Sequence, residues 1–204
     1  MKTLIKAISI GATALSLIAV SASTVLAGGH GPSWNLSNAD SKVAFGSVKA
    51  DVVGEVHQFG SVSGNMNDNG VATIEIDLAS VNTNIDIRNE RMQEHVFADK
   101  GSVSTLSATI DPKAVNDLAP GATAVIDVAG KLALGDVSLD INTTMFVAKL
   151  TDDKMMVTTD KMVMVSTEAL GINAGVDKLM ELAGLPSIDR VVPVTLRLVF
   201  DKAQ

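Results

Sequence analysis

The sequence contains no cysteine among its 204 residues. The chain therefore has no disulfide framework, no cysteine nucleophile and no attachment site for the lipid of a bacterial lipoprotein. Tyrosine is also absent, and the aromatic residues are limited to one tryptophan and five phenylalanines. Because sites that stack sugars or nucleic-acid bases usually rest on aromatic side chains, both kinds of site are disfavoured.

Basic residues are outnumbered, with 16 Lys and Arg against 23 Asp and Glu and a net charge of −7. Nucleic acids and anionic membrane surfaces are bound through basic patches, so we expect neither as a partner. Histidine is scarce, and no Gly-x-Ser-x-Gly motif is present. A serine–histidine–aspartate set could use only His57 or His95, and we expect both to be hydrogen-bonded structural residues. An enzyme that acts on a lipid headgroup through one of them is a less favoured alternative.

Residues 1–27 have the pattern of a secretory signal peptide. Lys2 and Lys6 supply the charged start, residues 7–20 form a short apolar core, and residues 25–27 form a cleavage site of the small-x-small type. We expect cleavage to leave one domain, residues 28–204, in the periplasm. After cleavage we expect no membrane span.

Cleavage at that position would expose Gly28-Gly29-His30 as the new amino terminus. A free amine, two amide nitrogens and an imidazole form a square-planar set that suits Cu(II) or Ni(II). Methionine thioethers can hold Cu(I), and five methionines occur close together in the sequence: Met145, Met155, Met156, Met162 and Met164. A copper-handling protein is therefore the main alternative function, but the favoured interpretation of His30 is a residue that happens to lie in a disordered tail. We otherwise expect no metal and no cofactor.

The mature chain is dominated by segments in which polar and apolar residues alternate, as they do in half-buried strands. We expect eight strands, at about residues 41–56, 59–66, 71–78, 102–111, 122–134, 137–150, 155–167 and 191–200. Eight long, sequence-adjacent antiparallel strands can close into a barrel with room for one small ligand. The predicted fold class is all-β, an eight-stranded antiparallel barrel, with a sandwich as the competing closure.

The first predicted strand contains a change of phase. Val43 and Phe45 share one parity, whereas Val48, Ala50 and Val52 have the other. We interpret the change near Gly46 as a bulge that bends a long strand.

Two short helices interrupt the strands. Between residues 85 and 97 the spacing becomes helical, with Ile85, Met92 and Val96 on one face. A second helix is expected at residues 174–183, ended by Gly184. A charged helix inserted among barrel strands either closes an open end of the barrel or forms part of a site.

The sequence resembles the YceI-like family of secreted bacterial proteins. The resemblance begins at Trp-Asn-Leu (34–36) and continues through His-Gln-Phe (57–59). It is most specific at Ile-Asp-Leu-Ala-Ser-Val-Asn-Thr (76–83), followed by Ile-Arg-Asn-Glu-Arg-Met (87–92). The resemblance implies a lipocalin-like barrel whose elongated apolar cavity holds a long-chain amphiphile such as a polyisoprenoid, an isoprenoid quinone or a fatty-acid derivative. It also implies a binding or carrier role without catalysis.

A cavity for a flexible apolar chain needs adaptable walls, which methionine and phenylalanine can supply. We expect a group of such residues to bind the ligand: Phe45, Phe59, Met92, Phe97, Phe146, Met162 and Met164. Arg88 is the candidate for the headgroup, since an inward arginine can bind an oxygen or a carboxylate. The sequence leaves open whether Arg88 or Arg91 faces the cavity or solvent. The barrel surface is compatible with a homodimer, but the sequence shows no interface.

Overall fold

The computed structural model describes residues 32–204. The predicted signal peptide and the Gly28-Gly29-His30 sequence lie outside the described residues, so both stay predictions. Within residues 32–204, no helix is long and apolar enough to cross a membrane.

Strands make up most of the described chain. They are β1 (Pro32–Leu36), β2 (Lys42–Lys49), β3 (Val53–Phe59), β4 (Val62–Asn67), β5 (Val71–Asp77), β6 (Val81–Asn82), β7 (Val103–Thr109), β8 (Thr123–Leu134), β9 (Val137–Thr151), β10 (Lys154–Thr159), β11 (Val163–Ser166) and β12 (Val191–Lys202). The helices are short: the 3-10 helix η1 (Leu78–Ser80), α1 (Asp86–His95), α2 (Lys113–Asn116) and α3 (Asn173–Ala183).

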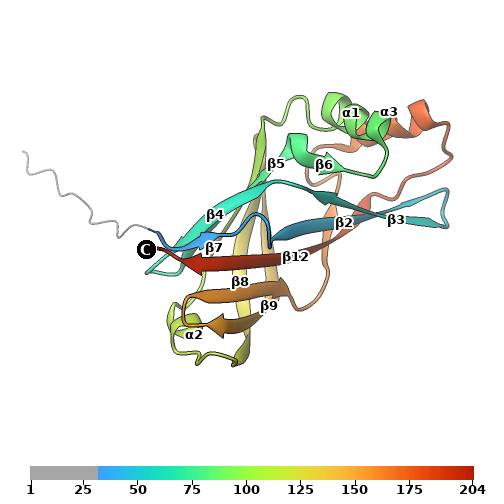
Figure 1. Cartoon of the computed structure of the whole chain (residues 1–204). Coiled ribbons are helices and arrows are strands. Elements are labelled where there is room, and N and C mark those ends of the chain that lie inside the picture. Colours follow the sequence, from blue (N-terminus) through green and yellow to red (C-terminus); the bar gives the residue numbers. More distant parts are fainter. Residues whose placement is uncertain (1–31) are drawn as a thin grey trace, which may run out of the picture.

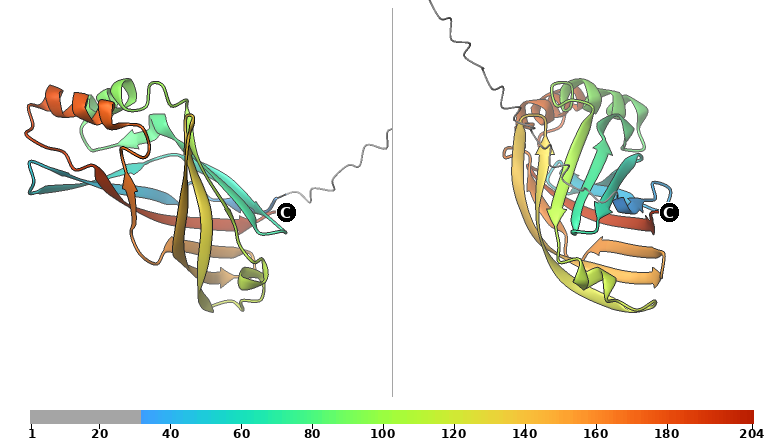
Figure 2. Two further views of the ribbon diagram at one scale, coloured as in Figure 1. Left: turned by 180° about the vertical axis from the view of Figure 1, so that it is seen from behind. Right: turned by 90° about the vertical axis from the view of Figure 1, so that its left-hand side faces the viewer.

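Eight of these strands form a closed ring. Each is paired antiparallel with the next in the order β1, β4, β5, β7, β8, β9, β10 and β12, and β12 pairs again with β1. The predicted eight-stranded antiparallel barrel is therefore confirmed, and Figures 1 and 2 show how its strands wrap around the interior. The first half of β12 extends beyond the ring, where it pairs with β2 on one edge and with β11 on the other.

Two predicted strands are each divided in two. The segment predicted at residues 155–167 forms β10 and β11. The segment predicted at residues 41–56 is a hairpin of β2 and β3, whose register runs without interruption from Val43↔Phe59 to Lys49↔Val53. The predicted bulge near Gly46 is therefore wrong. The hairpin turns at residues 50–52, where Ala50 and Asp51 adopt positive φ angles of 49° and 63°. The turn was not predicted because these residues lack the Asn-Gly or Asp-Gly pair that is typical of a two-residue hairpin turn.

Helices α1 and α3 pack side by side over one end of the barrel, as Figure 1 shows. Their close contact depends on Gly175, because a Cβ atom at this position would lie 2.3 Å from the carbonyl oxygen of His95. Gly184 ends α3 in the left-handed conformation, as predicted. The short α2, which follows Pro112, was not predicted; it lies near the opposite end of the barrel (Figures 1 and 2).

The core has a main cluster toward each end of the barrel. The cluster beneath α1 and α3 includes Met92, Val96 and Phe97. The opposite cluster includes Trp34, Val115 of α2 and other buried side chains from the strands. A lumen is left between the two clusters.

Candidate functional site

The barrel encloses a cavity of about 540 Å³ that reaches from Val115 of α2 to Leu179 of α3. Its wall is formed almost wholly by apolar side chains. The alternation of each strand explains this, since successive residues point to opposite faces. In β8, Ile126 and Val128 line the cavity, whereas Val125 faces outward and is 57% exposed. The volume falls within the range of small-molecule sites.

Four predicted residues form one part of this wall. The rings of Phe45 and Phe59 lie 5.4 Å apart between centroids, and those of Phe59 and Phe97 lie 6.1 Å apart. Met92 of α1 lines the cavity with them. The sequence therefore identified an aromatic wall on β2, β3 and the segment after α1.

Three other predicted residues do not line the cavity. Met162 and Met164 are 65% and 58% exposed, while their neighbours Val163 and Val165 point inward. Phe146 lies on the outer face of β9, between the inward-facing Met145 and Val147. The expectation that these three contribute to the wall is wrong, because strand alternation places each of them on the opposite face.

Polar side chains occupy the inward face of the β2–β3 hairpin. After Phe45 the inward positions of β2 are Ser47 and Lys49, and before Phe59 those of β3 are Glu55 and His57. This explains the apparent change of phase in the sequence. Strand β2 continues regularly, but its inward residues change from apolar to polar after Phe45. The charged side chains that line the cavity therefore gather at one end, the polar end, whereas the rest of the wall is largely apolar.

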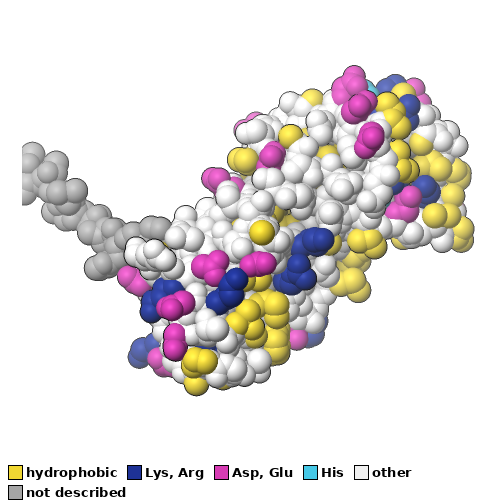
Figure 3. All heavy atoms as spheres, in the orientation of Figure 1, with side chains coloured by type: hydrophobic (Ala, Val, Ile, Leu, Met, Phe, Trp, Pro, Cys, Tyr) yellow, Lys and Arg dark blue, Asp and Glu magenta, His cyan; other side chains and the backbone are white. Residues whose placement is uncertain are grey.

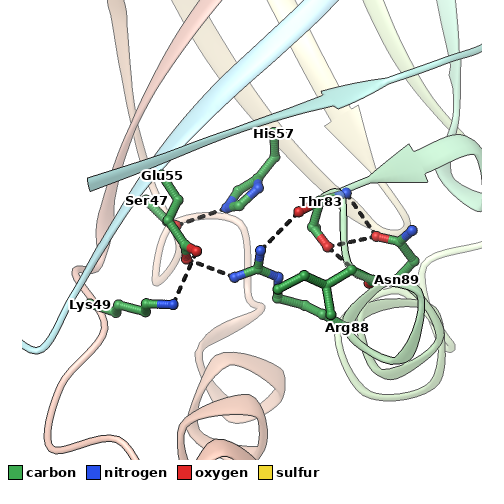
Figure 4. Close-up of polar contacts among 8 residues, drawn as sticks. Ser47, Lys49, Glu55, His57, Thr83, Arg88 and Asn89 are labelled. Carbon is green, nitrogen blue, oxygen red and sulfur yellow. Dashed lines mark hydrogen bonds and ion pairs between the residues drawn. The ribbon is translucent and has the colours of Figure 1, made fainter. Parts of the chain in front are cut away.

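Arg88 of α1 points into this polar end, as Figure 4 shows. Its Nη1 atom donates to Glu55 Oε2 at 2.7 Å, and its Nη2 atom donates to the carbonyl oxygen of Thr83 at 2.8 Å. Thr83 is fixed in turn by Asn89, whose side-chain oxygen accepts hydrogen bonds from the Thr83 amide and hydroxyl, both at 2.7 Å. Lys49 donates to the other oxygen of Glu55 at 3.0 Å. Arg88 therefore faces the cavity.

These contacts set the charges at the polar end. Burial raises the pKa of Glu55, but the hydrogen bonds from Arg88 and Lys49 outweigh burial and hold this pKa below its usual value. Burial, together with the positive charge of Arg88, lowers the pKa of His57. Glu55 is therefore a carboxylate and His57 is neutral at neutral pH.

A family model described as a YceI-like domain matches residues 34–200. The chain belongs to the YceI-like family. The resemblance found in the sequence is thereby confirmed.

Two solved structures extend this result. A polyisoprenoid binding domain from Saccharophagus degradans, implicated in plant cell wall breakdown, is 34% identical with a TM-score of 0.82, over 84% of this chain and 99% of that chain. BcnA of Burkholderia cenocepacia is 19% identical with a TM-score of 0.60, over 80% of this chain and 98% of that chain, and shows the same fold. A comparison with curated protein sequences gives no match.

In this YceI-like barrel the residues considered for catalysis do not complete a triad. Ser47 Oγ and His57 Nε2 lie 2.9 Å apart, which matches the first pair of a nucleophilic site. However, His57 Nδ1 has no partner among residues 32–204, so no carboxylate orients the ring. His95 does not line the cavity, and its Nε2 atom lies 3.7 Å from Oε2 of Glu94.

The methionines considered for copper do not form one cluster. Met145 and Met155 are buried and line the cavity, whereas Met162 and Met164 are exposed on the outer surface. Within residues 32–204, His, Asp and Glu side chains form no group of three that could hold a metal ion.

Apolar side chains are exposed around the polar end of the cavity. Figure 3 shows a concentration of such side chains over the β2–β3 hairpin and α3. Val52 in the hairpin turn is 83% exposed, and Ile87 in the first turn of α1 is 51% exposed and also lines the cavity. Arg91 lines the same region, with Nη1 3.5 Å from the carbonyl oxygen of Leu182.

Proposed function

We propose that this protein is a periplasmic carrier that holds one long apolar chain, of the polyisoprenoid type, in the lumen of its barrel without catalysing a reaction. The observation that supports this proposal most strongly is the lumen itself, whose long apolar wall leads to a single polar end. A molecule that complements this shape has an extended apolar tail and a small polar head.

The energetics favour a tail-directed binder. Burial of each methylene contributes about 0.8 kcal/mol, so a chain of isoprene units gains affinity along its whole length. Few polar contacts are then needed, and the wall offers few. The relative from Saccharophagus degradans is named for polyisoprenoid binding, which supports the same class of ligand here.

The non-catalytic part of the proposal rests on the polar end. Ser47 and His57 resemble the first two members of a nucleophilic triad, but no acidic group among residues 32–204 orients His57. Glu55, the carboxylate nearest in sequence, is held instead by Arg88 and Lys49. The polar end is therefore suited to binding a headgroup rather than to activating Ser47.

Native mass spectrometry of protein purified from the periplasm of its host tests this proposal. We expect a co-purified organic mass that solvent extraction removes, and cell fractionation should place the mature protein, starting at Gly28, in the periplasm. Protein of apo mass only, with stoichiometric Cu(II) uptake that His30→Ala abolishes, would contradict the proposal and favour a copper-handling protein.

A further inference from the structure

The Nε–H group of Arg88 is a buried hydrogen-bond donor that is not used. A guanidinium group has five N–H donors and no acceptor, and Arg88 directs Nη1 to Glu55 and Nη2 to the Thr83 carbonyl. Its Nε atom is buried and has no hydrogen-bond partner among the described residues. Because an unpaired buried N–H group is costly, this atom indicates a place where a ligand oxygen is received.

His57 offers a second unused nitrogen in the same polar end. The residue is only 5% exposed, its Nε2 atom is engaged by Ser47, and its buried Nδ1 atom has no partner among residues 32–204. Its ring lies 5.2 Å from that of Phe45 between centroids. His57 therefore stands where the polar end of the cavity meets the apolar wall, which is where the head of a bound chain would lie.

The neutral imidazole can adapt to the ligand. If Ser47 donates its hydroxyl proton to Nε2, Nδ1 carries the ring proton and donates. If Nε2 donates to Ser47, Nδ1 accepts. With the fixed N–H of Arg88 Nε in the same polar end, the protein therefore offers groups that suit either a carbonyl or a hydroxyl.

The hydrogen bonds that Arg88 already makes disfavour an anionic head. A two-pronged contact with a carboxylate or phosphate uses two N–H groups of the guanidinium, and both Nη atoms of Arg88 already direct an N–H group to Glu55 and Thr83. An added anion would have to lie beside the Glu55 carboxylate or displace it, and Glu55 is also held by Lys49. An uncharged oxygen needs only the unused Nε–H and does not compete for the contacts of Arg88 with Glu55 and Thr83.

We propose that Arg88 Nε and His57 Nδ1 form a headgroup site for an uncharged oxygen function, a carbonyl or a hydroxyl, and discriminate against phosphorylated chains of the same length. The inference rests on the proposed function, because it assigns a head to the chain that the lumen receives. The site selects the head of the ligand, whereas the apolar wall binds the tail.

Three probes with a shared branched tail test the inference: phytane, phytol and phytyl phosphate. Each is titrated against protein loaded with the neutral fluorophore N-phenylnaphthylamine, and displacement reports occupancy of the cavity. We expect phytol to bind about tenfold more tightly than phytane, as is typical for a hydrogen bond to a charged donor, and more tightly than phytyl phosphate.

Arg88→Lys is the decisive variant, because lysine keeps the cation beside Glu55 and lacks the Nε–H group. It should lose the preference for phytol over phytane while still binding phytane. Arg197→Lys is the matched control: Arg197 Nε already donates to the Asp40 carbonyl at 3.3 Å outside the cavity, and this variant should keep the preference.

The outcomes separate the two proposals. Three results would each overturn the headgroup site while leaving the carrier function intact. The unmodified protein could bind phytol and phytane equally, or it could bind phytyl phosphate more tightly than phytol. The third result is an unchanged preference for phytol over phytane in Arg88→Lys. If none of the three probes displaced the fluorophore, the carrier function would fail, and the headgroup site with it.

Discussion

A tryptophan placed inside the barrel should abolish the binding of a long chain without destroying the fold. Val128 lies on the inward face of β8 and lines the lumen, so the larger side chain of Val128→Trp would occupy space that the tail needs. If the indole displaces about four methylenes of the ligand, the lost burial is about 3 kcal/mol. This corresponds to roughly a hundredfold weaker binding.

Val125→Trp is the matched control, because Val125 lies in the same strand, faces outward and is 57% exposed. Both variants are compared with the unmodified protein by displacement of N-phenylnaphthylamine with phytol, and thermal unfolding checks that each is folded. Tight binding by a folded Val128→Trp variant, or an equal loss of affinity in Val125→Trp, would refute the assignment of the tail to the lumen.

Three further predictions concern the polar end and the helices above it. Glu55→Gln should raise the affinity for phytyl phosphate relative to phytol in the same displacement assay, because it frees Arg88 from its carboxylate partner. The unfolding free energy, measured in urea, should fall as the pH drops below 6.5, because the lowered pKa of buried His57 lets the unfolded chain bind the proton first; His57→Gln should lack this component. Gly175→Ala should lower the unfolding free energy by about 1–3 kcal/mol, as overpacking does, because the new Cβ atom would clash with the carbonyl oxygen of His95. The control Ala174→Ser, at the neighbouring exposed position, should have little effect.

The sequence was sufficient to predict an eight-stranded barrel because most of its strands alternate and follow one another along the chain. It did not predict β1, which closes the ring, and the segment predicted at residues 41–56 forms β2 and β3 outside the ring. The lengths of β8 and β9 and their antiparallel pairing agree closely with the alternation at residues 122–134 and 137–150. Helix α1 was also predicted, since the change from period two to helical spacing is visible between Ile85 and Val96.

The wall of the cavity was harder to predict, because a period of two shows which residues share a face but not which face is inside. Met162 and Met164 do share a face, as expected, but it is the outer one. Met155 is buried and lines the lumen, and its inward parity continues through Val163 and Val165 despite the break between β10 and β11. If Met155 had been predicted to point into the barrel, the alternation would have placed Met162 and Met164 on the outer face.

The polar end of the site was obscured by the same alternation. Val48, Ala50 and Val52 suggested a bulge, but Val48 lies on the outer face of β2 and the other two residues lie in the hairpin turn. In the structure the inward residues Ser47, Glu55 and His57 are polar because they surround Arg88, which comes from another segment of the chain. The polar–apolar pattern of one strand does not reveal that its residues pair with a residue from a distant segment such as Arg88.

A crystal structure of the protein with phytol bound is the most direct test of the carrier proposal. We predict that the tail lies within the barrel against Phe45, Phe59 and Phe97, and that the hydroxyl oxygen lies about 3 Å from Arg88 Nε. A phytol molecule bound only to the exposed outer surface around Val52, with the lumen unoccupied, would contradict this account.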